Sequence, residues 1–341
     1  MRKLFFTLAV FIMALCANAQ TNQYFWYQGN LMLGNPIAQI DSVTFGEGEP
    51  ADTLHILLPR TIIKEVHDTV YITIHDTVCP NDIPEGALVG EFSVSATKKI
   101  RFSKGNLQYQ ATTSTWRFAE DQWESIGYGN ENISSTYDGW IDLFGWGTGN
   151  NPTMASLSNV DYPSFVDWGN NFISNGGNVA GEWRSLTKDE WVYLAHERAN
   201  AANLFGFANI NGINGLILLP DNWTPTDGMP SFSTSADKGV TWQNNMYYNS
   251  ANNNFSQNSF TIDQWMVLES KGAIFLPATG ARTDYNLMDN INSRGSYWTA
   301  TAYDSDYAYD VDFNSEHFNP QEYYGNRKHF GQSVRLVQDV K

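Results

Sequence analysis

Residues 183–191 read WRSLTKDEW and contain the clearest helix start in the chain. Thr187 followed three residues later by Glu190 is a capping box, in which each side chain binds a backbone N–H of the other residue. The apolar run Trp191–Ala195 follows directly. We therefore expect a helix that begins just after Thr187.

The same order of signals occurs a second time. A capping box at Thr261–Gln264 leads into the apolar run Trp265–Leu268. Each predicted helix is followed by a short apolar run that ends in proline, Leu216–Pro220 and Ala273–Pro277, and such runs are typical of buried strands. The rest of residues 86–341 is rich in Gly, Asn, Ser and aromatic residues. The sequence therefore predicts an α+β domain with few helices and much irregular backbone.

The first 19 residues have the pattern of a secretory signal peptide. Two positive charges precede the apolar run Leu4–Leu15, and ANA at residues 17–19 fits the cleavage pattern. We expect an exported chain that starts at Gln20 and is periplasmic, on the outer cell surface or secreted. The alternative is a lipoprotein anchored at Cys16, where a bulky leucine precedes the cysteine. No later stretch has the ~18 continuous apolar residues of a membrane helix.

Two smaller parts are expected between the signal peptide and the domain at 86–341. Residues 20–48 form a short β-hairpin unit, with the runs Tyr24–Leu33 and Ile40–Phe45 joined by a turn at Gly34-Asn35-Pro36. Residues 49–85 form an extended linker, or stalk, in which polar and β-branched residues alternate.

The stalk and hairpin contain four Asp-hydroxyl-aliphatic triplets, which start at Asp41, Asp52, Asp68 and Asp76. They resemble the O-glycosylation acceptor of secreted Bacteroidetes proteins, and chance within a Thr-rich repeat is the alternative. After signal cleavage the chain keeps a single cysteine, Cys79. It has no partner for an internal disulfide, so it is either an idle linker thiol or pairs between two chains.

The chain has a formal net charge of −16. This acidity disfavours nucleic acid as a partner, because phosphate backbones are repelled. It equally disfavours adsorption to anionic membranes, and solubility is its simplest role.

Three motifs resemble the formylglycine-generating-enzyme-like, or sulfatase-modifying-factor, superfamily. Residues 183–191 resemble its Arg-Leu-Pro-Thr-x-x-Glu-Trp signature, with Leu186 in place of the usual proline. Gly331–Val337 (GQSVRLV) resembles its final strand, and Tyr297–Thr301 (YWTAT) resembles the Tyr-Trp-Ser-Ser-Thr run of its Bacteroidetes and Fibrobacter paralogous domains. The resemblance covers about residues 88–338. It implies a C-type-lectin-like fold, with a small twisted antiparallel sheet, two helices and long irregular loops.

The resemblance does not extend to catalysis. The oxidase members share a C-terminal cysteine pair, and this chain has no cysteine after Cys79. Because a thiolate is the nucleophile and soft-metal ligand of that chemistry, we expect no formylglycine-generating activity and no catalytic residue. Iron-dependent members use a His-rich site. His196, His317 and His329 are the only histidines of the domain, and His196 is expected to be a solvated helix residue.

Calcium is the other metal to consider, because lectins of this fold bind it. Asn319-Pro320-Gln321 is only loosely similar to the lectin calcium motif, and no Trp-Asn-Asp triplet is present. Oxygen ligands are available at Asp304, Asp306, Asp310 and Asp312. Acidic residues at a spacing of two on a strand favour a solvated face instead. We expect no cofactor, with calcium as an open alternative.

A sugar-stacking surface next to the glycine run at 145–149 is one interpretation of its aromatic neighbours. Trp140, Asp142 and Trp146 would line it. The alternative is that both tryptophans belong to the core.

The segment from Arg294 to Val337 is crowded with Tyr, Asp, Asn and Ser. Tyrosine and tryptophan give rigid contact area, and Asn and Ser give adaptable hydrogen bonds. Because Ser333–Val337 reads as the closing strand, the candidate surface is Tyr297–Tyr324. The residues expected to bind a ligand are Trp298, Tyr303, Asp304, Tyr307, Tyr309, Asn314 and Tyr323.

The sequence therefore predicts a secreted or cell-surface, non-catalytic binding module that recognises a glycan or a protein. One alternative is a metal-dependent enzyme of the same superfamily. Another is a structural or fimbria-associated subunit that assembles through the N-terminal hairpin.

Overall fold

The structure is a computed structural model that describes residues 83–248, 254–323 and 326–341, together with four short strands near the N-terminus. The chain divides into two compact units, Met1–Asp82 and Ile83–Lys341. Among the described residues, no helix combines the length and the apolar character needed to cross a membrane.

The first unit contains two antiparallel strand pairs. β2 (Asn22–Tyr27) pairs with β3 (Asn30–Pro36), and β1 (Thr7–Leu8) pairs with β4 (Val43–Thr44). The predicted turn at residues 34–36 is wrong, because these residues lie inside β3 and the chain reverses between β2 and β3 instead. In this register Phe25 lies opposite Leu33 and Trp26 lies opposite Leu31.

Several predictions for the first unit fall outside the described residues. These are the signal-peptide cleavage site, the lipoprotein alternative at Cys16, the stalk with Cys79, and the four glycosylation triplets apart from Val43.

Both predicted helices of the main unit are present with their caps. α1 (Lys188–Val192) starts with the capping box, in which Glu190 N donates to Thr187 Oγ1 at 3.2 Å and Thr187 N donates to Glu190 Oε2 at 2.9 Å. It continues as the π-helical turn η6 (Tyr193–Glu197). α2 (Ile262–Ser270) begins with the second predicted box. These two helix starts are confirmed.

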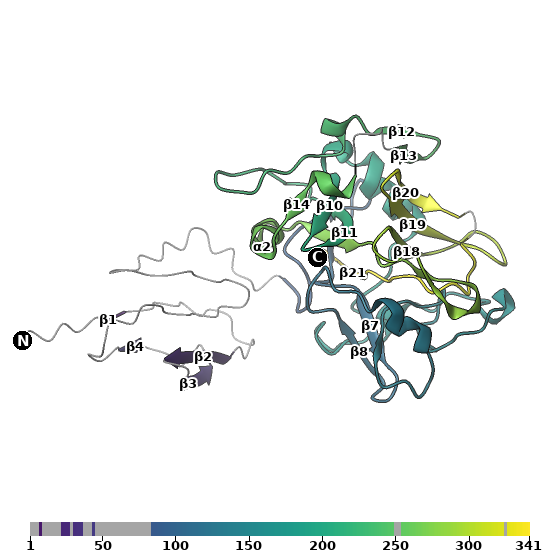
Figure 1. The fold of residues 1–341 in the computed structure, drawn as a ribbon, viewed down its shortest axis with the longest axis horizontal. Helices are drawn as coiled ribbons and strands as arrows, with labels where there is room; N and C mark the ends of the chain where they lie inside the picture. Colours follow the sequence, from purple (N-terminus) through teal and green to yellow (C-terminus); the bar gives the residue numbers. More distant parts are fainter. Residues whose placement is uncertain are drawn as a thin grey trace, which may run out of the picture. The chain divides into compact units, whose positions relative to one another are not determined.

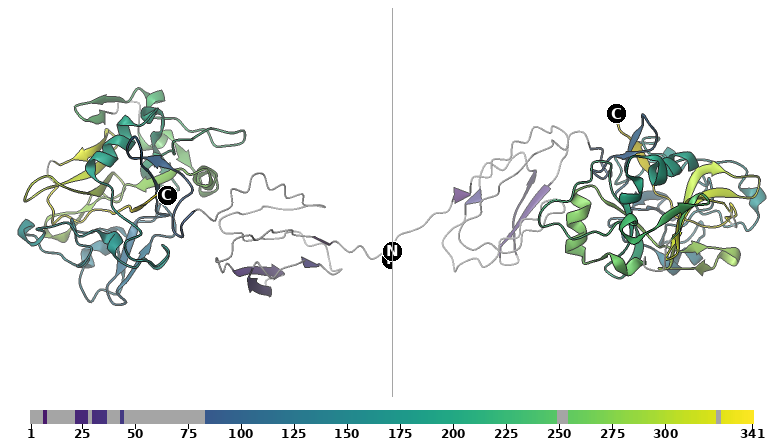
Figure 2. Two further views of the ribbon diagram at one scale, coloured as in Figure 1. Left: turned by 180° about the vertical axis from the view of Figure 1, so that it is seen from behind. Right: turned by 90° about the horizontal axis from the view of Figure 1, so that it is seen from above.

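The strands predicted after the helices pair with each other in a four-stranded sheet of order β14-β10-β11-β15. Its strands are β14 (Ser259–Phe260), β10 (Phe205–Ile210), β11 (Ile213–Leu218) and β15 (Ile274–Pro277). β14 runs parallel to β10, and the other pairs are antiparallel. α2 packs on this sheet, since Trp265 and Leu268 share an apolar cluster with Ile217 and Phe275 (Figure 1, Figure 2).

The largest sheet is antiparallel and has the order β12-β13-β20-β19-β18. Its strands are β12 (Thr241–Gln243), β13 (Met246–Tyr248), β20 (His317–Glu322), β19 (Ala308–Asn314) and β18 (Arg294–Ala302). The candidate surface predicted from the sequence lies on the last three of these strands and their connections.

Three smaller sheets complete the main unit. Their strands are β21 (Val337–Asp339), β6 (Lys99–Phe102) and β5 (Phe92–Ser93); β8 (Thr115–Phe118), β7 (Leu107–Gln110) and β9 (Trp140–Ile141); and β16 (Ala281–Arg282) with β17 (Met288–Asp289). Short 3₁₀ turns lie between the helices and strands of the main unit at η3 (Gly127–Asn132), η4 (Asn159–Asp161), η5 (Trp168–Asn170), η7 (Ala201–Asn203), η8 (Ala236–Lys238), η9 (Phe255–Gln257) and η10 (Asp284–Asn286).

The closing strand is placed differently from the prediction. β21 starts only at Val337, and the buried residues before it bond to several separate segments in turn. Gln332 exchanges backbone hydrogen bonds with Phe144, and Ser333 bonds with Ser296 and Trp298. Because no single strand runs alongside these residues, they join several sheets and do not extend one.

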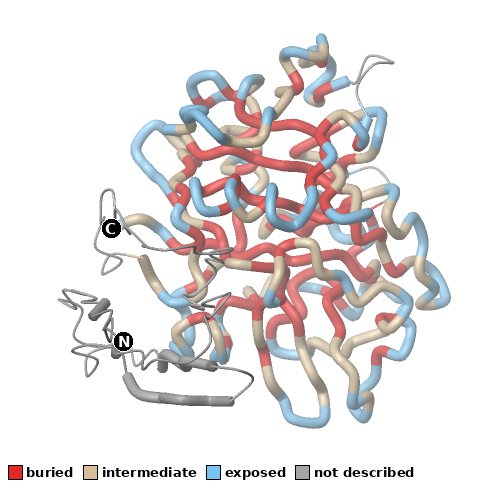
Figure 3. Tube along the Cα trace, turned by 60° about the vertical axis from the view of Figure 1, so that its left-hand side comes forward, coloured by how far each residue is buried: buried red, intermediate tan, exposed pale blue. Residues whose placement is uncertain are grey.

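The interior is built from three apolar clusters. The first joins the four- and five-stranded sheets with α1 and β6, the second surrounds Trp168 and Trp183, and the third lies under α2. Figure 3 shows the buried segments gathered inside the unit, with exposed loops around them. The main unit is therefore an α+β protein with mostly small antiparallel sheets and few helices.

Candidate functional site

Three of the predicted binding residues, Tyr303, Tyr309 and Tyr323, come together on the surface. We call them the tyrosine cluster. Tyr303 follows the end of β18, Tyr309 lies at the start of β19, and Tyr323 follows the end of β20. Because neighbouring strands of this sheet are antiparallel, these three positions meet at the same end of the sheet.

The rings of the tyrosine cluster pack on one another and remain accessible. Tyr303 and Tyr323 are stacked with ring centroids 4.2 Å apart, and the Tyr309 ring stands edge-on to both at 5.5 and 5.8 Å. Tyr303 is 46% exposed and Tyr323 is 41% exposed. The nearby Tyr323 hydroxyl raises the pKa of Tyr303 above its ordinary value. The cluster is thus a preassembled aromatic surface.

The hairpin that carries Tyr303 is held by a network of hydrogen bonds. Asp304 Oδ1 accepts from the backbone N–H groups of Asp306 at 2.7 Å and Tyr307 at 2.8 Å. The buried Lys328 Nζ donates to the Asp304 carbonyl at 2.7 Å, and Tyr303 N donates to Tyr307 O at 3.0 Å. Asp304 and Tyr307 therefore shape the turn that positions Tyr303.

Charged groups border the cluster on two sides. The Lys188 ammonium lies 5.4 Å from the Tyr309 ring centroid and pairs with Asp189 at 2.6 Å. Asp304 and Asp306 are exposed at the hairpin tip. Lys188 was read from the sequence only as part of a capping box. Its contact with Tyr309 could not be predicted, because the two residues are far apart in the chain.

Two predicted binding residues do not join the cluster. Trp298 is only 3% exposed, and its indole N–H donates to the Phe144 carbonyl at 2.7 Å. It is therefore a core residue and has no surface to offer a ligand. Asn314 lies at the opposite end of β19, where its Oδ1 accepts from Glu316 N at 2.7 Å and shapes the β19–β20 turn.

The expected solvated face of acidic residues is wrong for Asp310 and Asp312, which are fully buried. β18 and β19 are covered on both faces, since Tyr297 belongs to the first apolar cluster and Trp298 to the second. Asp312 accepts from Arg294 and Ser296, and His317 Nε2 lies 2.6 Å from its Oδ1.

Asp310 has a different environment from Asp312. Its Oδ1 accepts from Asn326 Nδ2 at 2.7 Å, whereas its Oδ2 has no partner among the described residues. Burial, followed by the neighbouring Asp312 carboxylate, raises the pKa of Asp310 well above its ordinary value.

This environment predicts a pH dependence of stability. A carboxyl group whose folded-state pKa is raised stabilises the fold fully below its unfolded pKa, and this contribution is lost as pH rises through the folded pKa. We expect the melting temperature of Asp310→Asn to fall less than that of wild type as pH is raised from about 4. Asp306→Asn, which removes an exposed charge from the same hairpin, is the control. If the melting temperatures of wild type and Asp310→Asn change by the same amount over this pH range, this account is contradicted.

The three histidines have separate environments. His196 is half-buried and stacks on Trp242 with ring centroids 3.9 Å apart, so its expected position as a solvated residue is wrong. His317 contacts Asp312, and the buried His329 lies between Asn159 and Asp284. Within the part of the chain that the structure describes, no group of three or more His, Cys, Asp or Glu residues is arranged to hold a metal ion.

The suggested stacking surface near the glycine run is wrong for two of its three residues. Trp146 is 3% exposed and its indole N–H donates to the Thr299 carbonyl at 3.0 Å. Asp142 is fully buried and accepts from Ile126 N and Asn130 Nδ2. Only Trp140 is partly exposed, and the Arg117 guanidinium covers its ring at 3.9 Å.

Comparison with known proteins finds one matching family, and no activity is known for that family. A family model described as a domain of unknown function (DUF8237) matches residues 243–337. This range contains α2 and β18 to β20, and therefore the whole tyrosine cluster. No curated protein and no solved structure matches the chain.

Proposed function

We propose that this chain is an exported, non-catalytic binding module whose main unit is C-type-lectin-like and presents the tyrosine cluster to a glycan or protein ligand. The observation that carries the proposal is the stacked, accessible pair of Tyr303 and Tyr323, with Tyr309 edge-on beneath them. Exposed tyrosines whose rings are already ordered lose little conformational freedom when they bind, and tyrosine is among the residues that contribute most at interfaces.

Contacts among the three motifs support the superfamily resemblance. Arg184 of the first motif exchanges backbone hydrogen bonds with Val337 of the last motif, both at 2.9 Å. Ala300 of the middle motif donates to the Leu186 carbonyl at 2.9 Å, and Lys188 N donates to Thr301 Oγ1 at 3.1 Å. Segments far apart in sequence therefore form one packed unit, as expected if they define a shared fold.

The first motif also contains an ion pair that links α1 to the chain end. Arg184 binds Glu190 through two bonds of 2.8 Å and binds Asp339 at 2.6 Å. Because Glu190 also completes the cap of α1, one carboxylate holds both the helix start and Arg184. α1 in turn places Lys188 beside the tyrosine cluster.

A combined glycan and surface-protein array tests the proposal. The mature chain is expected to give a signal on a defined set of glycans or proteins, and Tyr303→Ala/Tyr323→Ala is expected to lose the signal on part of that set. Equal signals from both proteins would remove the tyrosine cluster from the site. Stoichiometric iron or copper in the purified protein would overturn the non-catalytic assignment and favour an enzyme of the same superfamily.

A further inference from the structure

We propose that the main unit has a second binding site, a pocket for a neutral sugar formed between η7 and the loop that follows β11. The pocket has a volume of about 630 Å³, within the range of ~300–1,000 Å³ typical of small-ligand sites. Its lining combines aromatic and other apolar side chains with amides and hydroxyls: Asn200, Asn203, Leu204, Trp223, Pro225, Thr226, Met229, Pro230, Ser231, Phe232 and Thr234.

The loop that forms the pocket is tied to the scaffold near both ends. Asp221 N donates to the Glu91 carbonyl at 3.0 Å. At the other end, Ser233 N donates to Asn258 Oδ1 at 2.8 Å, and the buried Asn258 returns a bond from Nδ2 to the Ser233 carbonyl at 2.9 Å. Ser235 N then donates to the Phe205 carbonyl at 2.8 Å. The pocket is therefore largely formed before a ligand arrives.

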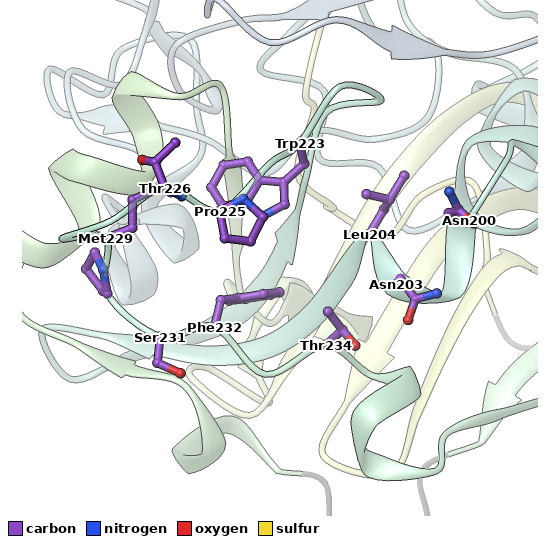
Figure 4. A pocket seen from close by; sticks show the side chains of 11 residues that line it. Asn200, Asn203, Leu204, Trp223, Pro225, Thr226, Met229, Ser231, Phe232 and Thr234 are labelled. Atoms are coloured by element: carbon purple, nitrogen blue, oxygen red, sulfur yellow. The ribbon is translucent and has the colours of Figure 1, made fainter.

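Aromatic and apolar surface supplies one half of the recognition chemistry. Trp223, Met229 and Phe232 are half-buried and pack against the third apolar cluster, so one side of each is fixed. Their remaining surface lines the pocket (Figure 4). Rigid aromatic rings of this kind suit the C–H face of a pyranose ring, which is apolar and flat.

Free polar groups supply the other half. Asn200, Asn203 and Ser231 are exposed, and among the described residues their side chains make no hydrogen bond to the rest of the protein. In Figure 4 both asparagines lie at one end of the lining, beside Leu204, and Thr226 and Met229 lie at the other. An amide offers both donors and an acceptor, which matches the paired hydroxyls of a sugar.

The absence of ionisable side chains in the lining selects against charged ligands. None of the eleven lining residues is Asp, Glu, His, Lys or Arg. A carboxylate or ammonium would lose water on entering this pocket without gaining a charged partner, whereas a neutral ring with hydroxyls would not carry that cost. This site is independent of the tyrosine cluster, because the two share no residue.

Saturation-transfer NMR on the mature chain tests the proposal with methyl glycosides of glucose, galactose, mannose and N-acetylglucosamine as probes. At least one is expected to receive saturation at its ring protons. Trp223→Ala and Asn203→Ala are each expected to weaken its binding at least about tenfold, or ~1.4 kcal/mol. Asn203 is exposed, so its replacement leaves the core intact. Tyr303→Ala/Tyr323→Ala is expected to bind the probe like wild type.

Three results would overturn the pocket assignment. The first is no saturation of any of the four glycosides. The second is that Trp223→Ala and Asn203→Ala both bind the glycoside with the affinity of wild type, or that Tyr303→Ala/Tyr323→Ala binds it more weakly. The third is binding of linear sorbitol or anionic glucuronate as strong as that of the neutral glycosides.

Discussion

Replacement of Asp221 by alanine is expected to lower the free energy of unfolding by about 3–5 kcal/mol, the range seen when one partner of a buried ion pair is removed. Asp221 Oδ1 accepts from Arg198 Nη1 at 3.1 Å, and its carboxylate also accepts from Ser93 N and, at 2.6 Å, from Ser93 Oγ. The Arg198 side chain is 2% exposed. Without Asp221, the buried guanidinium would keep, among the described residues, a single long hydrogen bond, to the Leu204 carbonyl.

The pKa directions of the pair agree with this expectation. Burial lowers the pKa of Arg198, which means that the protein interior disfavours its charged form. Although burial raises the pKa of Asp221, hydrogen bonds from Ser93 and the charge of Arg198 hold it below its ordinary value. The Asp221 carboxylate therefore offsets the unfavourable free energy of burying the charged Arg198 guanidinium.

Denaturant unfolding of three variants checks this prediction. Asp189→Ala removes an acid that is 86% exposed and paired with Lys188, and it should change stability by less than about 1 kcal/mol. Arg198→Met/Asp221→Ala should recover part of the loss, because no uncompensated charge remains. Similar stabilities for Asp221→Ala and Asp189→Ala would show that the buried pair is not important for the fold.

Replacement of Trp298 by alanine is expected to destabilise the protein by about 3–5 kcal/mol, the cost typical of a large aromatic residue lost from a core. The ring packs in the second apolar cluster, and its N–H donates to the Phe144 carbonyl, which also accepts from Gln332 N. Trp298→Phe keeps most of the ring and loses one hydrogen bond, while the Phe144 carbonyl keeps its bond from Gln332 N, so a cost of about 0.5–1.5 kcal/mol is expected.

Binding and stability should separate at this position. If Trp298 is only a core residue, Trp298→Phe will bind ligand like wild type once the protein is folded. If Trp298→Ala instead melts like wild type but no longer binds the ligand, Trp298 belongs to the binding site. These measurements distinguish the two roles of Trp298, because the sequence alone predicts that it binds ligand, whereas the structure buries it in the core.

Local signals explain what could be predicted from the sequence. A capping box acts within four residues, so Thr187 with Glu190 and Thr261 with Gln264 identified both helix starts. Continuous apolar runs likewise identified β11 and β15, because a strand covered on both faces needs no alternation.

Tertiary contacts explain what could not be predicted. The spacing of Asp310 and Asp312 indicates one face of a strand, but the segment that buries this face, with Asn326 and Gln332, comes later in the chain. The tyrosine cluster was predicted by residue type, and its grouping depends on the pairing of β18, β19 and β20. The pocket around Trp223 was missed, because its lining comes from an irregular loop without periodicity.

The most direct test of the central claim is the dissociation constant of the ligand found on the array, measured for three forms of the mature chain. Tyr303→Ala/Tyr323→Ala is expected to raise it at least about tenfold, which corresponds to ~1.4 kcal/mol. The matched control is Tyr128→Ala/Tyr285→Ala, which removes two tyrosines that are 69% and 80% exposed in other segments. The account predicts that this control binds like wild type, and equal losses in the two double variants would contradict it.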